Sequence, residues 1–229
     1  MFAYIPARIG SRRIKEKNIY KVDGIPMIKH VIGNLKKLSF INGVYVSTDS
    51  HKIRKIVEVL DVSVLSLRDK KLSGDQATFM DLIKKDIPRF ADHTKCNDIL
   101  FVLPTAILVP PEVYNDAYKK YKKLKPEILI ATEKITNPIW WAMEIKKNYL
   151  HPIFKDKVSV DSSKLKPAYS DAGLFYFFNQ KKVAKYVSHK NARKILPYMI
   201  NSNYTCDLNT VSDLEYLIYK YKLLKSKSP

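Results

Sequence analysis

The chain has 229 residues, and its 41 Lys and Arg against 22 Asp and Glu give a formal net charge of +19. A hydrophobic content of 46% predicts a packed globule and excludes a disordered chain. The sequence has no apolar run long enough to span a bilayer and no signal-peptide pattern in residues 1–15, so we expect a cytoplasmic protein with no membrane partner. Its two cysteines, Cys96 and Cys206, lie far apart in the sequence and predict no disulfide framework.

Apolar periodicity predicts alternating strands and helices along the first 132 residues. The predicted strands cover residues 2–5, 44–48, 62–67, 99–103 and 128–132. The predicted helices follow residues 24–26 and cover residues 53–60, 79–90 and 110–124. This alternation predicts an α/β fold with a mostly parallel, Rossmann-like sheet that carries helices on both faces.

Residues 135–178 break this rhythm, because residues 139–145 and 173–178 are aromatic-rich extended segments with no clean helix between them. We interpret residues 135–178 as an antiparallel insertion within a single domain, 1–229. Its aromatic side chains could line a substrate site, form a dimer contact or fill the core, and core or dimer contact is preferred. The remaining predictions are a helix near 181–188, a strand near 198–206, a last helix with an apolar face from 211 to 221, and a frayed tail at 225–229.

The first predicted strand runs directly into a basic loop that contains Gly10 and Ser11. In α/β proteins such a loop holds phosphates, since backbone N–H groups and cationic side chains converge at the carboxyl end of the strand. The loop matches neither the P-loop nor the G-x-G-x-x-G pattern, so a solvated basic loop is the alternative. Its cations are Arg8, Arg12, Arg13 and Lys17.

The net positive charge favours anionic partners, either a nucleoside triphosphate or nucleic acid. The lysine pairs are spread over the predicted helix faces, and no zinc-finger, RNP-like or helix-turn-helix pattern is present. We therefore expect no dedicated nucleic-acid groove, and a nucleic-acid binder is retained only as a rival hypothesis.

Other polar residues follow the later strands, among them Asp49, Arg68, Thr105 and Asp207. Carboxylates can hold Mg²⁺, which usually takes one or two of them together with substrate phosphates. Asp207 and Asn209 are two residues apart, so both side chains point the same way in an extended segment. Asp49 and Asp207 could equally be helix N-caps. We interpret the two cysteines and the five histidines as surface or structural residues; the histidines are His30, His51, His93, His151 and His189.

The order Ile-Pro-Ala-Arg-x-Gly-Ser-Arg from Ile5 to Arg12, continued to Asn18, resembles the nucleotide loop of the acylneuraminate cytidylyltransferases. Further motifs of that family appear in the same order along the whole chain. The Asp-Ala-Gly stretch is similar to the pseudaminic acid branch. These motifs are Val46–Asp49, Leu67–Arg68 with Leu72–Asp75, Leu103–Ala106, Tyr169–Tyr176, and Asp207–Thr210 with Asp213.

The resemblance implies a nucleotidyltransferase fold and an enzyme that couples CTP to an acidic nine-carbon sugar with Mg²⁺ as cofactor, releasing pyrophosphate. It also implies a homodimer in which the insertion reaches the neighbouring subunit. Three residues, Arg8, Arg12 and Lys17, would be catalytic. The nucleotide site would comprise Arg8, Gly10, Ser11, Arg12, Lys17, Asn18, Arg68, Pro104 and Thr105. The sugar would contact Tyr169, Asp171, Gly173, Phe175 and Tyr176, and the metal would contact Asp207 and Asn209.

Four positions depart from the family pattern. Ile9 replaces a glycine, and a β-branched residue restricts the backbone there. Asn209 replaces an aspartate, and one charge pair at about 4 Å is worth roughly 4 kcal/mol at an effective dielectric near 20. Asp161 and Leu174 replace an Arg and a Gln of the pseudaminic acid branch. Two alternatives therefore stay open: a non-catalytic nucleotide-binding relative, and activation of another keto-acid sugar such as Kdo.

Overall fold

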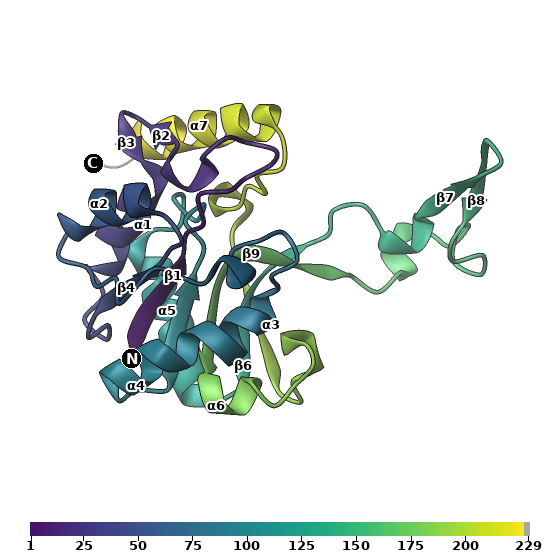
Figure 1. The fold of residues 1–229 in the computed structure, drawn as a ribbon. Coiled ribbons are helices and arrows are strands. Elements are labelled where there is room, and N and C mark those ends of the chain that lie inside the picture. Colours follow the sequence, from purple (N-terminus) through teal and green to yellow (C-terminus); the bar gives the residue numbers. More distant parts are fainter. Residues whose placement is uncertain (227–229) are drawn as a thin grey trace.

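The computed structural model describes residues 1–226 and is built around a six-stranded sheet of order β10-β6-β9-β5-β1-β4 (Figure 1). Strand β1 pairs in parallel with β4 and β5, and β10 pairs in parallel with β6. Strand β9 runs antiparallel between β5 and β6. The predicted α/β fold is confirmed. The strands are β1 Phe2–Pro6, β4 Val44–Ser47, β5 Asp98–Val102, β6 Ile128–Lys134, β9 Tyr169–Asn179 and β10 Ile195–Met199.

Helices cover both faces of this sheet. One face packs against α1, α2, α5 and α7, whose apolar side chains share a core with Leu100, Phe175 and Phe177. The other face packs against α3, α4 and α6 around Phe101 and Phe178. The helices are α1 Met27–Leu35, α2 His51–Glu58, α3 Phe79–Asp81, α4 Ile87–Thr94, α5 Pro111–Leu124, α6 Gln180–Val183 and α7 Val211–Ser226. A π-helical turn, Leu82–Asp86, joins α3 to α4.

Two small hairpins complete the fold. Strands β2 Lys21–Val22 and β3 Ile25–Pro26 pair across Asp23 and Gly24, which both have positive φ, as a two-residue hairpin turn requires. Strands β7 Met143–Lys146 and β8 Tyr149–Pro152 form an antiparallel arm that projects far from the sheet (Figure 1).

The predicted insertion ends too late in the sequence. The arm matches the expected antiparallel character, but residues 169–179 return to the central sheet as β9. Phe175 and Phe177 enter one core, while Tyr176 and Phe178 enter the other. These aromatic side chains therefore fill the core, and the strand looked exceptional because both of its faces are buried.

Four further predictions need correction. Residues 62–67 form no strand, and their single bridge to the described residues joins Tyr45 to Ser63. The helix near 181–188 stops at Val183, and the strand near 198–206 lies earlier, because residues 202–204 form a 3₁₀ turn. Lys225 and Ser226 belong to α7 and are not frayed, while residues 227–229 lie outside the described part. Among the described helices, none has the length and apolar character to cross a membrane.

Candidate active site

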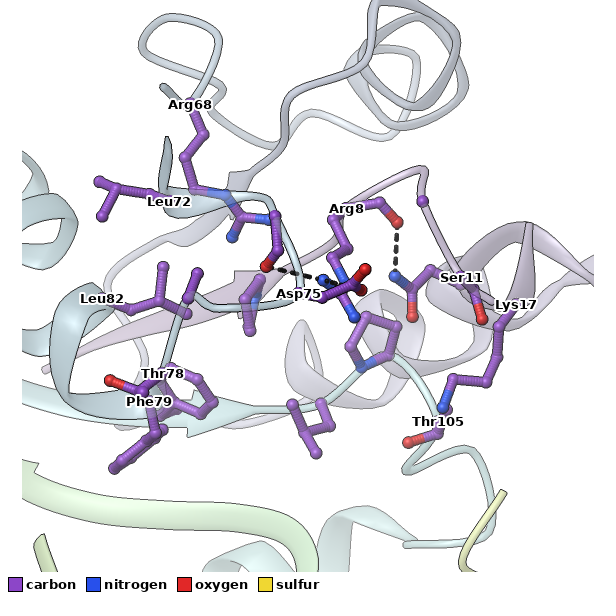
Figure 2. Close-up of a pocket in the computed structure, with 18 of the residues that line it drawn as sticks. Arg8, Ser11, Lys17, Arg68, Leu72, Asp75, Thr78, Phe79, Leu82 and Thr105 are labelled. Atoms are coloured by element: carbon purple, nitrogen blue, oxygen red, sulfur yellow. Dashed lines mark hydrogen bonds and ion pairs between the residues drawn. The ribbon is translucent and has the colours of Figure 1, made fainter. Parts of the chain in front are cut away.

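A cavity of about 550 Å³ opens at the carboxyl ends of β1 and β5. Figure 2 shows Arg8, Ser11 and Lys17 on one side of it, and Thr78 and Phe79 on the other. All nine residues predicted for the nucleotide line this cavity, and their roles remain predictions. They are Arg8, Gly10, Ser11, Arg12, Lys17, Asn18, Arg68, Pro104 and Thr105.

The basic loop after β1 is fixed by hydrogen bonds from its neighbours. Arg8 Nη1 donates to the carbonyl oxygens of Ser73 at 3.2 Å and Gly74 at 2.9 Å. Asn18 Nδ2 donates to the carbonyl oxygen of Arg8 at 2.8 Å, so it closes the loop from inside. The cationic side chains are thus carried by an ordered backbone, as a phosphate site requires.

Ile9 fits this loop without backbone strain. It is not among the described residues with positive φ, and its side chain packs against the core. Its N–H donates to Asp49 Oδ1 at 3.0 Å, which fastens the loop to the end of β4. Asp49 is therefore not a helix N-cap. Ser50 caps α2 instead, because its Oγ accepts from the N–H of Ile53 at 3.4 Å.

Lys17 connects the basic loop to the proposed metal-binding segment. Its Nζ donates to the carbonyl oxygen of Leu208 at 3.1 Å. Burial lowers the pKa of Lys17, and the neighbouring cation Arg13 lowers it further, whereas Asp207 opposes the shift. The Asp207 segment therefore lies close enough to act on the charge of the basic loop.

Asp207 and Asn209 lie beside each other, outside the lining of the cavity. Asn209 Nδ2 donates to Asp207 Oδ2 at 2.6 Å. Asp213 accepts from the N–H groups of Asn209 at 2.8 Å and Thr210 at 2.6 Å, while Thr210 Oγ1 accepts from the N–H of Asp213 at 3.2 Å. This reciprocal pattern makes Thr210 the cap of α7, so the N-cap interpretation of Asp207 is wrong.

The donor set at this segment is a carboxylate and an amide oxygen. Both are hard oxygen ligands, which Mg²⁺ prefers. Within residues 1–226 no cluster of three or more His, Cys, Asp or Glu could hold a metal. The residues therefore fit an ion that takes most of its ligands from substrate phosphates and water, and they do not form a complete cage.

Arg68 supplies a buried cation to the cavity. Arg68 is only 4% exposed, and its Nε donates to Ser73 Oγ at 3.0 Å. Its Nη1 is buried and has no hydrogen-bond partner among residues 1–226. An unsatisfied buried N–H group is costly, so this nitrogen marks a place where a ligand oxygen or ring nitrogen would bind.

His189 is a cavity residue that the sequence interpretation missed. It lines the cavity together with Phe79 and Tyr176, and its ring lies edge-on to Phe79 at 4.7 Å between centroids. Its Nε2 is buried, has no hydrogen-bond partner in the described part of the chain and lies 3.6 Å from Asp171 Oδ2. The prediction that His189 is only a surface or structural residue therefore leaves out its place in the cavity. No sequence signal shows this place, because the fold brings His189, Phe79 and Tyr176 together from different parts of the chain.

Asp171 lies behind Tyr176 and does not line the main cavity. It accepts the Tyr176 hydroxyl at 2.9 and 3.0 Å and the N–H of Gly173 at 2.9 Å. Burial would raise the pKa of Asp171, but contacts with His189, Gly173 and Tyr176 outweigh burial and lower it. Asp171 is thus held as a carboxylate that can orient Tyr176 and His189.

The predicted sugar residues lie in four different places. Tyr176 lines the main cavity, whereas Tyr169 and Asp171 line a neighbouring hollow of about 450 Å³. Gly173 has φ +61 where the pairing of β9 with β6 shifts register, so it serves a bulge. Phe175 is fully buried between Tyr114 and Tyr198, and its prediction as a sugar contact is wrong.

The chain is similar in sequence to known proteins along almost its whole length. The chain is 28% identical over 225 residues to a pseudaminic acid cytidylyltransferase of Campylobacter jejuni subsp. jejuni serotype O:2, covering 96% of this chain and 95% of the relative. It is 26% identical to a CMP-N,N'-diacetyllegionaminic acid synthase of Legionella pneumophila, covering 93% and 92%.

A solved structure shares the fold. It is a CMP:2-keto-3-deoxy-manno-octonic acid synthetase complexed with CTP, with a TM-score of 0.71 at 13% identity and coverage of 97% and 98%. The family model described as Cytidylyltransferase matches residues 2–219. The resemblance stated from the motifs is confirmed, and the chain belongs to the cytidylyltransferase family.

Proposed function

We propose that this protein transfers CMP from CTP to an acidic nine-carbon keto sugar of the pseudaminic acid type and releases pyrophosphate. The observation that carries the proposal is the cavity itself, which joins the loop cations Arg8, Arg12 and Lys17 to Arg68, whose buried Nη1 has no partner among the described residues. Family membership and the name of the Campylobacter relative support the choice of CTP and sugar.

The cavity suggests how the substrates lie. The triphosphate takes the basic end, and the cytidine lies toward Arg68 and Asn18. The anomeric hydroxyl of the sugar attacks the α-phosphorus and gives its proton to water, a new P–O bond forms, and the bond to the β-phosphate breaks as pyrophosphate leaves. No covalent enzyme intermediate is needed. The loop accelerates this exchange by positioning the groups and by neutralising phosphate charge.

The sugar would lie toward Tyr176 and His189, next to the hollow that Asp171 lines. Two departures from the pseudaminic acid pattern lie outside the main cavity. Leu174 is buried in the core, and Asp161 accepts from the N–H of Ser163 at the start of a 3₁₀ turn. They therefore give no steric reason against a pseudaminic acid type sugar in this cavity.

Magnesium is part of the proposal, with Asp207 and Asn209 as its protein ligands. When bound, the ion would supply positive charge at the phosphates. The change Asn209→Asp restores a second carboxylate, so we expect a lower Mg²⁺ concentration at half-maximal rate and a rate at least as high as that of the native chain. Titration of the rate with Mg²⁺ measures this. An unchanged or higher Mg²⁺ concentration at half-maximal rate in the variant would remove Asn209 from the metal site.

We also propose a homodimer formed through the arm, and a cytoplasmic site of action where CTP is available. The arm exposes Ile145 at 75%, Tyr149 at 73% and Leu150 at 66%. Apolar side chains gathered on a projecting hairpin mark an interaction surface. A second copy of the chain is the partner that we propose for this surface.

The direct test is pyrophosphate release from each of the four common nucleoside triphosphates with Mg²⁺. The acceptor panel contains pseudaminic, legionaminic and N-acetylneuraminic acids and Kdo. We expect release with CTP and a nine-carbon acid. Release with Kdo alone would correct the sugar class. Binding of CTP without turnover on any acceptor would favour the non-catalytic relative over the enzyme.

A further inference from the structure

Asp75 is an acidic residue inside a cavity that is otherwise basic at this end. It lines the cavity next to Arg8 and Arg12. Its Oδ1 lies 3.2 Å from Arg8 Nη1, and its Oδ2 lies 2.5 Å from Arg12 Nε. Figure 2 shows Asp75 beside Arg8. A carboxylate that repels phosphate needs an explanation in a proposed triphosphate site.

The segment that carries Asp75 is well fastened. The N–H of Gly74 donates to the carbonyl oxygen of Lys70 at 3.1 Å, and the N–H of Ala77 donates to that of Gly74 at 3.2 Å. Ser73 Oγ accepts from Arg68 Nε at 3.0 Å. Asp75 therefore stands on an ordered turn that also contacts the buried Arg68, and the turn gives its carboxylate a defined place.

Asp75 uses only part of each guanidinium. All described contacts of the Arg8 side chain go through Nη1, which also donates to Ser73 and Gly74. The described contact of Arg12 goes through Nε. Within residues 1–226, Nε and Nη2 of Arg8 and both Nη atoms of Arg12 thus remain available to phosphate oxygens. A guanidinium with one edge fixed and the other free is suited to bind a phosphate.

Asp75 restricts the side chain of Arg12 more than that of Arg8, because the Arg12 side chain is 80% exposed and Asp75 is its one described partner. A free arginine loses rotamer freedom when it binds a ligand, and that loss weakens binding. A fixed carboxylate that already restricts the side chain removes part of this loss. Arg8 benefits less, since two backbone carbonyls hold it as well.

We propose that Asp75 is a positioning residue that holds Arg8 and Arg12 ready for the polyphosphate of the nucleotide. This inference rests on the proposed function, which places the triphosphate at the basic end of the cavity. It makes a prediction opposite in sign to simple electrostatics, in which removing a negative charge would strengthen the binding of an anion.

The test is calorimetric titration of the full chain with inorganic pyrophosphate and, separately, with cytidine. We expect Asp75→Asn to weaken pyrophosphate binding about tenfold and to leave cytidine binding unchanged. Asp75→Glu, which keeps the charge, should restore part of the affinity. Asp92→Asn makes the same change in net charge outside the cavity, so it should leave pyrophosphate binding unchanged.

Unchanged or tighter pyrophosphate binding by Asp75→Asn, in a variant with the thermal stability of the native chain, would overturn the inference. The proposed function fails in a different way. A native chain that does not turn over CTP, yet binds pyrophosphate in an Asp75-dependent manner, would contradict the enzymatic proposal and support this role of Asp75.

Discussion

At the scale of single residues, Lys17 is the cation that joins the basic loop to the Asp207 segment. It donates to the Leu208 carbonyl, and burial favours its uncharged form relative to an exposed lysine. An anion bound at the basic end would reverse that effect by stabilising the charged amine. A substitution of Lys17 therefore tests directly whether the triphosphate binds at this end of the cavity.

We expect Lys17→Met to lower kcat/KM for CTP by about ten- to a hundredfold, the range for one charge-assisted hydrogen bond. Steady-state kinetics with varied CTP measures this. Lys15→Met is the matched control, because Lys15 is exposed in the same loop and does not line the cavity. Equal effects of the two changes would show that only the overall charge matters.

A substitution of Phe175 can distinguish a role in core packing from a role in sugar binding. It is fully buried, with its ring centroid 5.0 Å from that of Tyr114. We expect Phe175→Leu to destabilise the fold by about 1–2 kcal/mol while KM for the sugar stays unchanged. Denaturant unfolding and steady-state kinetics measure the two effects. A raised KM at unchanged stability would return Phe175 to the substrate site.

At the scale of elements, the start of α7 depends on one carboxylate. Backbone hydrogen bonds from Asn209 and Thr210 lower the pKa of Asp213. A lowered pKa means that the folded state gains stability at pH values above the unfolded pKa of about 3.9, and that this gain is lost as pH falls through the lower, folded value.

Asp213→Asn should therefore lower the Tm at neutral pH, and the gap between variant and native chain should narrow in acid. Thermal denaturation followed from about pH 7 to about pH 3 tests this dependence. A gap of constant size across that range would mean that the carboxylate charge contributes nothing to the cap of α7.

Local patterns predicted most elements of the first 132 residues, because their helices and strands each show a clear period. Residues 173–178 are extended as predicted, but their assignment to the insertion is wrong, because no local pattern shows that Phe175 to Phe178 join the central sheet. Residues 62–67 are apolar enough for a strand, but within residues 1–226 only Ser63 forms a β-bridge, to Tyr45.

Part of the candidate site could be predicted from the sequence, and part of it depends on the fold. The nucleotide loop is contiguous in sequence, so its members were predicted together and do line one cavity. Asp75 and His189 reach that cavity from other segments, and their importance depends on distances to Arg12 and Asp171 that no local pattern contains. Tertiary packing decides such contacts.

At the scale of the whole molecule, the arm is the feature that the sheet does not explain. It carries exposed apolar side chains on a hairpin far from the core (Figure 1). An isolated two-stranded hairpin is only marginally stable in water, so contact with a second copy would stabilise it. The proposed dimer gives both the hairpin and its apolar surface a partner.

We expect the double change Ile145→Lys and Tyr149→Lys to convert the dimer to a monomer. Sedimentation velocity over a range of protein concentrations measures the mass. Lys146→Glu and Lys147→Glu, two polar changes in the same hairpin, provide a comparison for general disturbance of the arm. A native chain that sediments as a monomer at every concentration would contradict the dimer.

We propose that the enzyme uses this cavity to transfer CMP from CTP to an acidic nine-carbon sugar. The most direct measurement is ³¹P NMR of a reaction that contains the native chain, CTP, Mg²⁺ and pseudaminic acid. We predict equal amounts of pyrophosphate and of a phosphodiester that links CMP to the anomeric oxygen of the sugar. Intact CTP after prolonged incubation with each acid of the panel, under conditions where CTP binding is demonstrated, would contradict the claim.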